Sequence, residues 1–234
     1  MLRINVVTLF PELFDAPLRT SITGRAVVKG LVAFRVVDLR DYTHDRHRTV
    51  DDYPFGGGAG MVLKPEPFFE ALDDLAPESP IVLLSARGRP FRHDDAVRYS
   101  VGTELTLLCG HYKDVDARVG LRDDIEEVAL GDVVYSGGEF AAVGVIDAVV
   151  RLLPGALGDH ESAASDSFYE GLLSPPSYTR PRTYRGMSVP DVLVSGDHTA
   201  IEAWRRRQAE ELTRERRPEL WARYEAERSD QTET

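Results

Sequence analysis

The sequence predicts an α/β protein whose parallel sheet is covered by helices on both faces. Two compact apolar runs, residues 81–85 and 105–109, are typical of strands that are buried on both sides. Helix-like segments at 65–75 and 139–152 alternate with strand-like segments along the first two thirds of the chain. Because parallel strands need such crossover helices, the alternation favours a parallel sheet.

The individual elements follow from local composition. Residues 3–9 are rich in β-branched side chains and form the first predicted strand, and residues 10–14 follow it as a turn or short helix. A second strand is predicted over 33–39. Pro65 suits the first turn of the helix over 65–75, where its missing N–H is not needed. The helix over 139–152 is apolar and rich in Ala, Val and Ile.

The composition changes after Pro154, where a stretch of small and polar residues begins. This stretch indicates a linker or a loop that closes over a site. Residues 199–228 are helical in pattern and charge-rich, with an interruption at Pro218, and Ser195 or Asp197 could cap the first helix. We therefore predict a first domain over 1–158, a linker or lid over 159–168, and a small, mainly helical domain over 169–234.

Length and composition narrow the class of protein. The 234 residues are 42% hydrophobic and 29% charged, which is ordinary for a globular chain. The longest apolar runs are too short to cross a bilayer, and the N-terminus lacks a signal-peptide pattern. Cys109 is the single cysteine, so no disulfide can form within the chain. These features predict a cytoplasmic protein.

The charge is distributed unevenly along the chain. A net charge of −11 argues against non-specific nucleic-acid binding, which depends on cations. The segment from Arg180 to Arg217 reverses the average, with nine arginines against six acidic residues, and residues 40–48 form a second basic cluster. Taken alone, each cluster is best interpreted as the solvent-exposed face of a helix or loop.

Glycine-bearing segments suggest a ligand pocket. Residues 56–61 contain four glycines but no following Lys-Ser/Thr, so they do not form a phosphate-binding P-loop. Three further segments, 85–88, 109–112 and 131–139, each follow an apolar strand-like run. Ligands bind beyond the carboxyl ends of parallel strands, so these three loops are predicted to converge on one pocket. The alternative is three unrelated tight turns.

Asp166 and Arg151 are candidates for catalysis. Asp166 lies in the predicted lid, where a carboxylate could act as a general base, and Arg151 ends the apolar helix, where it could stabilise negative charge. For the pair taken by itself, a surface aspartate and a helix-end arginine are the favoured interpretation. The residues alone therefore predict an α/β enzyme with a ligand pocket and a basic C-terminal part.

These segments resemble, in order and spacing, the bacterial tRNA (guanine-N1)-methyltransferases, the TrmD-type enzymes of the SPOUT superfamily. The most specific match is the run Arg-Asp-Tyr-Thr-His-Asp-Arg-His-Arg-Thr-Val-Asp-Asp from Arg40 to Asp52. The resemblance extends from residue 1 to about residue 221. Its other segments are residues 9–12, 23–26, 56–61, 136–139, 166–168, 178–181 and 217–220.

The resemblance implies a deep trefoil knot near the C-terminal end of the first domain, which would hold S-adenosylmethionine in the three glycine-bearing loops. It also implies an obligate homodimer with the active site shared across the interface. The cofactor contacts that it implies are Leu83, Leu84, Ser85, Gly110, Tyr112, Leu130, Gly131, Asp132, Val133, Val134, Tyr135, Gly137 and Gly138.

The implied substrate is the guanosine immediately 3′ of the anticodon of a tRNA, preceded by another guanosine. The resemblance assigns to Asp166 the removal of the guanine N1 proton and to Arg151 the stabilisation of charge on O6. The predicted contacts to the anticodon stem-loop are Arg46, His47, Asp51, Gly57, Gly58, Arg180, Arg182 and Arg185.

The chain departs from the family in places. Family members commonly carry Gly-Arg-Tyr-Glu-Gly-Ile-Asp where this chain has Gly-His-Tyr-Lys-Asp-Val-Asp over residues 110–116. Lys113 therefore replaces a glutamate, which leaves the metal ligands unknown, although Mg²⁺ is a possible cofactor. The rival interpretations are a SPOUT-type RNA methyltransferase with another target base, a non-catalytic RNA-binding protein and a nucleotide hydrolase. The Arg40–Asp52 run argues against another SPOUT-type target. The presence of both Arg151 and Asp166 argues against a non-catalytic protein. The absence of a P-loop lysine argues against a nucleotide hydrolase.

Overall fold

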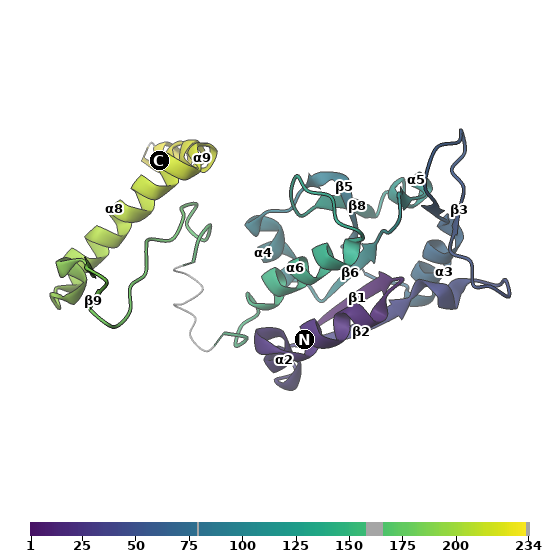
Figure 1. Ribbon diagram of the computed structural model, residues 1–234, viewed down its shortest axis with the longest axis horizontal. Coiled ribbons are helices and arrows are strands. Elements are labelled where there is room, and N and C mark those ends of the chain that lie inside the picture. Colours follow the sequence, from purple (N-terminus) through teal and green to yellow (C-terminus); the bar gives the residue numbers. More distant parts are fainter. Residues whose placement is uncertain (79, 158–165, 233–234) are drawn as a thin grey trace. The chain divides into compact units, whose positions relative to one another are not determined.

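The chain folds into two compact units, Met1–His160 and Glu161–Thr234. The computed structural model describes residues 1–78, 80–157 and 166–232. Most of the predicted linker over 159–168 therefore lies outside the described residues. The first unit contains the central sheet and the second contains two long helices (Figure 1).

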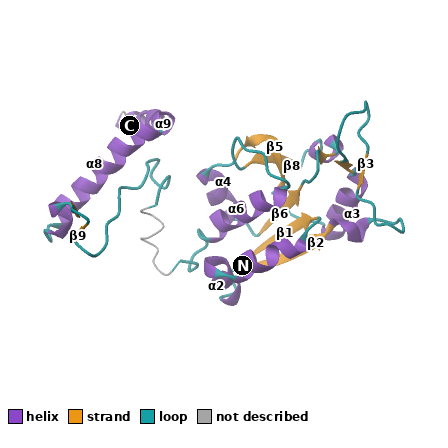
Figure 2. Ribbon diagram, viewed as in Figure 1, coloured by secondary structure: helices purple, strands orange, loops and turns teal. Residues whose placement is uncertain are grey.

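A five-stranded sheet, in which all neighbouring strands are parallel, forms the centre of the first unit (Figure 2). The strand order is β2-β1-β6-β5-β8. The bounds are β1 Leu2–Thr8, β2 Val32–Asp38, β5 Ile81–Pro90, β6 Glu104–Cys109 and β8 Ile125–Ala129. The predicted α/β class and the parallel sheet are confirmed, and so are the strands predicted near residues 3, 33, 81 and 105.

Helices connect these strands. Before β2 lie η1 (Pro11–Phe14), α1 (Asp15–Arg19) and α2 (Ser21–Val28), and η2 (Leu39–Tyr42) follows it. Next come α3 (Pro65–Leu75), α4 (His93–Ser100), α5 (Ala117–Gly120) and α6 (Gly138–Val150). The helix predicted over 65–75 has these bounds, and the one predicted over 139–152 begins one residue earlier and ends at Val150.

Each face of the sheet carries its own hydrophobic core, because successive side chains of a strand point in opposite directions. On one side, Val6 and Leu107 pack with α6 residues such as Ile146. On the other side, the neighbouring residues Val7 and Leu108 join a second cluster that includes residues of α3. The central strands are therefore buried from both sides, as their apolar runs predict.

A small second sheet extends the first unit at the carboxyl end of β6. It consists of β3 (Asp51–Asp52), β4 (Val62–Leu63) and β7 (Asp114–Val115), with β4 in the middle. The β4–β7 pairing is parallel and joins Val62 to Asp114. This pairing brings residues 56–61, which we call the glycine loop, beside the segment that follows β6.

The second unit is built on α8 (His198–Arg216) and α9 (Pro218–Thr232). A hairpin of β9 (Thr183–Tyr184) and β10 (Met187–Ser188) and the short helix η3 (Asp191–Val194) precede them. Asp197 is the N-cap of α8, since its carboxylate accepts a hydrogen bond from the Ala200 N–H at 3.0 Å. In the described ranges, no helix has the length and apolar character required to span a membrane.

Local sequence did not reveal α2, α4 or β8. The strand β8 contains Glu126 and Glu127, which break its apolar pattern. Glu126 accepts hydrogen bonds from Arg89, Arg98 and Tyr99 at 2.6–2.9 Å, so its charge is balanced by residues distant in sequence. A strand that carries such charges lacks the apolar or alternating pattern by which local sequence predicts a strand.

Candidate active site

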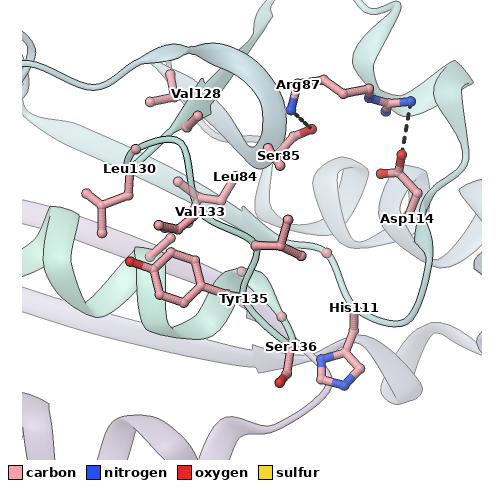
Figure 3. A pocket seen from close by; sticks show the side chains of 18 of the residues that line it. Leu84, Ser85, Arg87, His111, Asp114, Val128, Leu130, Val133, Tyr135 and Ser136 are labelled. Carbon is pink, nitrogen blue, oxygen red and sulfur yellow. Dashed lines mark hydrogen bonds and ion pairs between the residues drawn. The ribbon is translucent and has the colours of Figure 1, made fainter.

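A pocket of about 310 Å³ lies at the carboxyl edge of the parallel sheet. We call it the first pocket. Its walls come from the middle of β5, the segment after β6, the end of β8 with the loop that follows it, and α6 (Figure 3). The predicted convergence of the three glycine-bearing segments is therefore confirmed.

Glycines allow two of these segments to approach each other closely. The Gly138 N–H donates a hydrogen bond to the Gly110 carbonyl at 2.7 Å, and His111 pairs with Gly137 in an isolated antiparallel bridge. A Cβ atom on Gly138 would lie 2.9 Å from Cys109 Cα. The contact requires glycine at 138, because a side chain there would push the two walls apart.

The sequence predicts that the first of the three segments is a loop after a strand, and this prediction is wrong. Residues 85–88 belong to β5, whose register against β8 shifts between Leu84 and Arg89. Both Leu84 and Arg89 pair with Val128, so the residues between them bulge outward. Gly88 allows the bulge, since a Cβ there would lie 2.3 Å from Val128 N. The bulge turns Ser85 and Arg87 toward the pocket.

Charged side chains stand at the rim of the first pocket. Arg87 forms an ion pair with Asp114 at 2.9 Å, which links the β5 bulge to β7 (Figure 3). The exposed Lys113 covers the glycine loop, because a Cβ on Gly58 would lie 3.4 Å from its Nζ atom. The Lys113 N–H also donates to the Met61 carbonyl at 3.1 Å. Lys113 therefore connects the pocket with the glycine loop.

The structure places most of the predicted cofactor residues around the first pocket. Its walls include Leu84, Ser85, Gly110, Tyr112, Leu130, Gly131, Val133, Val134, Tyr135, Gly137 and Gly138. Leu83 is instead buried in the core, and the exposed Asp132 is not among the lining residues. The lining residues that were not named from sequence are Ala86, Arg87, His111, Lys113, Asp114, Val128, Ala129, Ser136 and Ala141. Most of these lie within or beside the predicted segments, which was the available signal.

The two predicted catalytic residues belong to different units. Arg151 is the C-cap of α6, half-buried, and its N–H donates to the Asp147 carbonyl at 3.2 Å. Asp166 begins the described part of the second unit and lines a pocket of about 720 Å³ there, which we call the second pocket. Their predicted roles stay predictions.

Arginines and an aromatic side chain surround Asp166 in the second pocket. Arg180, Arg182 and Arg205 line it together with Tyr178. The Tyr178 ring packs near Trp204, with 6.3 Å between ring centroids. Cations beside an aromatic surface form a setting that suits a phosphate and a nucleobase. Arg185, the other arginine predicted from this region to bind RNA, is exposed and lies over the Tyr184 ring.

The predicted RNA contacts of the first unit lie mainly in exposed segments. Arg46 and His47 occupy a turn that Asp45 organises by accepting hydrogen bonds from the His47 and Thr49 N–H groups. The bonds from Thr49 lower the pKa of Asp45 below its usual value. Asp51 is half-buried in β3, and Gly57 and Gly58 are exposed in the glycine loop, with φ of 77° and 112°.

The fold and the first pocket define a class: an α/β protein with a pocket among three close-packed segments at the carboxyl edge of a parallel sheet. The sequence model of the family described as tRNA (Guanine-1)-methyltransferase TrmD matches residues 2–223. The chain belongs to this family.

Relatives from several bacteria are similar along nearly the whole chain, and each is named tRNA (guanine-N(1)-)-methyltransferase. The protein of Dehalococcoides mccartyi (strain CBDB1) is 46% identical over 98% of this chain and 94% of its own length. That of Moorella thermoacetica is 49% identical over 95% and 91%. That of Dictyoglomus turgidum is 50% identical over 94% and 90%.

Proposed function

We propose that this protein transfers a methyl group from S-adenosylmethionine to N1 of a guanine in tRNA. The observation that carries the proposal is the first pocket, because its walls include residues 136–138, which belong to a segment by which the chain resembles its family. Relatives named for this activity align with almost all of both units, which supports the same activity for the whole chain.

The residues of the first pocket fit S-adenosylmethionine. The volume of about 310 Å³ lies at the lower end for small-molecule sites. Leu84, Val128 and Leu130 offer apolar surface to an adenine, and the close-packed glycine segments offer backbone N–H and C=O groups to its edge. Arg87, Lys113 and Asp114 give the rim charges of both signs, which suits a ligand that carries both an ammonium and a carboxylate group.

S-adenosylmethionine supplies an electrophilic methyl group when bound. Guanine N1 carries a proton and is a poor nucleophile, so the protein must remove that proton as the methyl arrives. Asp166 is the proposed base, with a contribution of about 10²–10⁴-fold to the rate. Loss of the proton places negative charge on O6, and Arg151 is the proposed group that stabilises it, worth about 10²–10³-fold.

The proposed RNA substrate is an anticodon stem-loop with the target guanosine immediately 3′ of the anticodon. Arg180, Arg182 and Arg185 contact its phosphates, while Arg46, His47, Asp51 and the glycine loop contact the target and its preceding guanosine. The trefoil knot, the tRNA-binding role of the helical second unit, a homodimer that shares its active site, and a cytoplasmic location belong to the same proposal.

Magnesium does not enter the proposed mechanism. In the described parts of both units, no group of three or more histidine, cysteine or acidic side chains is arranged to hold a metal ion. Lys113 also brings a positive charge to the rim, which disfavours a nearby cation.

The test is methyl transfer from labelled S-adenosylmethionine to an anticodon stem-loop that bears two adjacent guanosines. The wild-type protein is expected to methylate the second guanosine at N1, located by mass spectrometry of the digested RNA. Asp166→Asn should lower the rate by about 10²–10⁴-fold while cofactor binding persists. Arg151→Gln should lower it by about 10²–10³-fold.

Glu211→Gln is the matched control for Asp166→Asn. Glu211 is an exposed acid of the same unit that bonds Gln208 and does not line the second pocket. Its variant should keep the wild-type rate. No transfer by the wild-type protein, or full transfer by Asp166→Asn, would overturn the proposal, and methylation at another atom would favour the rival SPOUT-type activity.

A further inference from the structure

A buried carboxylate lies among the segments that form the first pocket. The Glu139 side chain stands in the first turn of α6 and is 1% exposed. Removal of a charge from water costs a large free energy, so such a group requires compensating partners. Neither proposed catalytic step uses this carboxylate.

Three partners compensate the charge of Glu139. The Thr8 hydroxyl, at the end of β1, donates a hydrogen bond to Glu139 Oε1 at 2.7 Å. The N-terminus of α6 favours a negative charge in its first turn. The third partner is His111, whose Nδ1 atom lies 3.6 Å from Glu139 Oε2.

The His111 imidazole is fixed on several sides. Its Nδ1 atom is buried and has no hydrogen-bond partner among the described residues, so Glu139 is the group that this nitrogen faces. The rings of Phe10 and Tyr112 pack against it, with centroids at 4.7 and 5.0 Å. A carboxylate beside Nδ1 makes that nitrogen a proton donor and thereby sets the tautomer and the orientation of the ring.

The close approach of Glu139 and His111 also explains the glycine at position 137. A Cβ atom there would lie 2.2 Å from Glu139 Oε2 and 2.3 Å from His111 Nδ1. The space beside Gly137 is therefore filled by the two facing polar atoms. His111 lines the first pocket and pairs through its backbone with Gly137, so Glu139 is joined to both pocket walls at once.

We propose that Glu139 is a positioning residue for the S-adenosylmethionine pocket and that it acts by holding His111. This inference rests on the proposed function. The carboxylate is fixed to the central sheet by Thr8 and holds the imidazole, and the imidazole holds the segment that carries Gly110, Tyr112 and Lys113. Loss of the charge frees this segment, which weakens cofactor binding more than it slows the reaction of the bound complex.

The same sheet offers a matched control. Glu104, at the amino end of β6, is 6% exposed and is also bound by a polar residue of β1, since Asn5 Nδ2 donates to it at 2.8 Å. Arg3 and the Glu78 N–H complete its contacts at 3.4 and 3.0 Å. Glu104 is thus a buried carboxylate that belongs to the core and does not line the first pocket.

The experiment compares Glu139→Gln with Glu104→Gln in the full-length protein. The dissociation constant for S-adenosylmethionine is measured by calorimetry, and KM and kcat are measured with the stem-loop. Glu139→Gln should weaken cofactor binding by about ten- to a hundredfold, because the Thr8 hydroxyl then no longer bonds a charged acceptor and His111 no longer faces a carboxylate. Its kcat at saturating cofactor should change far less. Glu104→Gln should lower the urea midpoint of unfolding and leave cofactor affinity unchanged.

A double-mutant cycle tests whether Glu139 acts through His111. If it does, Glu139→Gln should add little to the effect of His111→Asn, whereas independent residues give additive losses. Thr8→Val removes the hydroxyl that bonds Glu139 and the Phe10 N–H, and it should also weaken cofactor binding, so the proposal can be tested even if Glu139→Gln does not fold.

The outcomes separate the two proposals. Failure of the wild-type protein to bind S-adenosylmethionine would overturn the proposed function itself. If the wild-type protein binds and either Glu139→Gln or Thr8→Val binds equally well, the positioning role is wrong. An equal loss of affinity in Glu104→Gln, or additive losses in the cycle, would also overturn it, because the effect would then be one of general stability.

Discussion

The two units of this protein differ in the interactions that stabilise each of them internally. In the first unit, two large apolar clusters cover the two faces of the sheet, and side chains such as Leu107 and Leu108 are fully buried. In the second unit, the buried cluster consists of Leu172, Ala209 and Tyr224. The second unit therefore gains much less stability from apolar burial per residue and depends more on polar and aromatic contacts.

Arginines supply many of those contacts. Arg206 lies over the Tyr224 ring and bonds Glu210 at 2.9 Å, and Arg214 lies 4.3 Å from the centroid of the Trp221 ring. Arg180 and Arg205 line the second pocket and have no ion pair within the described residues. The arginines of the basic segment from Arg180 to Arg217 are thus of two kinds: some stabilise the second unit, and others are available to a ligand.

The largest expected effect is in the core of the first unit. Leu107→Ala should destabilise the protein by about 2–5 kcal/mol, because it leaves a cavity in a fully packed site. Hydrogen exchange of peptides from residues 1–157 in increasing urea measures this loss. Both tryptophans, Trp204 and Trp221, are in the second unit, so their fluorescence follows that unit separately. The control Val101→Ala, at an exposed site, should change stability by less than about 0.5 kcal/mol. Equal effects of Leu107→Ala and Val101→Ala would show that apolar burial does not stabilise the first unit as described.

A smaller loss is expected from the second unit. The Thr213 hydroxyl is buried, donates to the Ala209 carbonyl at 2.6 Å, and accepts from the Leu173 N–H at 2.9 Å. Thr213→Val leaves that N–H without its partner, which should cost about 1–3 kcal/mol. Urea unfolding followed by tryptophan fluorescence measures it, with the exposed Thr199→Val as control. A loss as large as that of Leu107→Ala would show that the second unit is not weakly packed.

Acid should weaken the first unit through Asp95 and Glu126. Burial raises the pKa of each carboxyl, but hydrogen bonds from Arg89 and Arg98 outweigh it, so both pKa values lie below their usual range. A lowered folded-state pKa gives stability that is present above the unfolded-state pKa and is lost as pH falls through the folded-state value. The urea midpoint should therefore decline below about pH 4.5, the ordinary value for glutamate.

Glu126→Gln tests the origin of this decline. The variant should reduce the stability that is lost on acidification by about 1 kcal/mol, because these pairs are partly exposed and screened by solvent. If the variant keeps the wild-type slope, the ion pairs of Glu126 do not cause the acid sensitivity.

The smallest stability effect separates the two kinds of arginine. Arg214→Ala should destabilise the second unit by about 0.5–1 kcal/mol, the usual value for an exposed cation–π contact, and should leave stem-loop affinity unchanged. Arg205→Ala should leave stability unchanged and weaken stem-loop binding. It should also reduce the slope of log affinity against log salt concentration by about one. Filter binding at several salt concentrations measures the second effect. The division of roles is wrong if the two variants behave alike.

Local sequence was sufficient for much of the fold. The apolar runs near residues 81 and 105 identified the buried strands, and Pro65 marked the start of α3. It was insufficient for β8, where Glu126 breaks the pattern and finds its partners on β5 and α4. For the pocket, the glycine-bearing segments indicated where the walls lie, but not that residues 85–88 continue a strand as a bulge.

By itself, the sequence determined the α/β class, the segments that form the first pocket and the family, because apolar spacing, glycine placement and motif order are properties of neighbouring residues. Only the tertiary structure decided which arginines of the second unit are committed to aromatic rings and which line its pocket. It alone brought Thr8 to Glu139, 131 residues apart, with His111 beside them. Contacts of this kind depend on strand register and close approach between distant segments, and no local pattern records either.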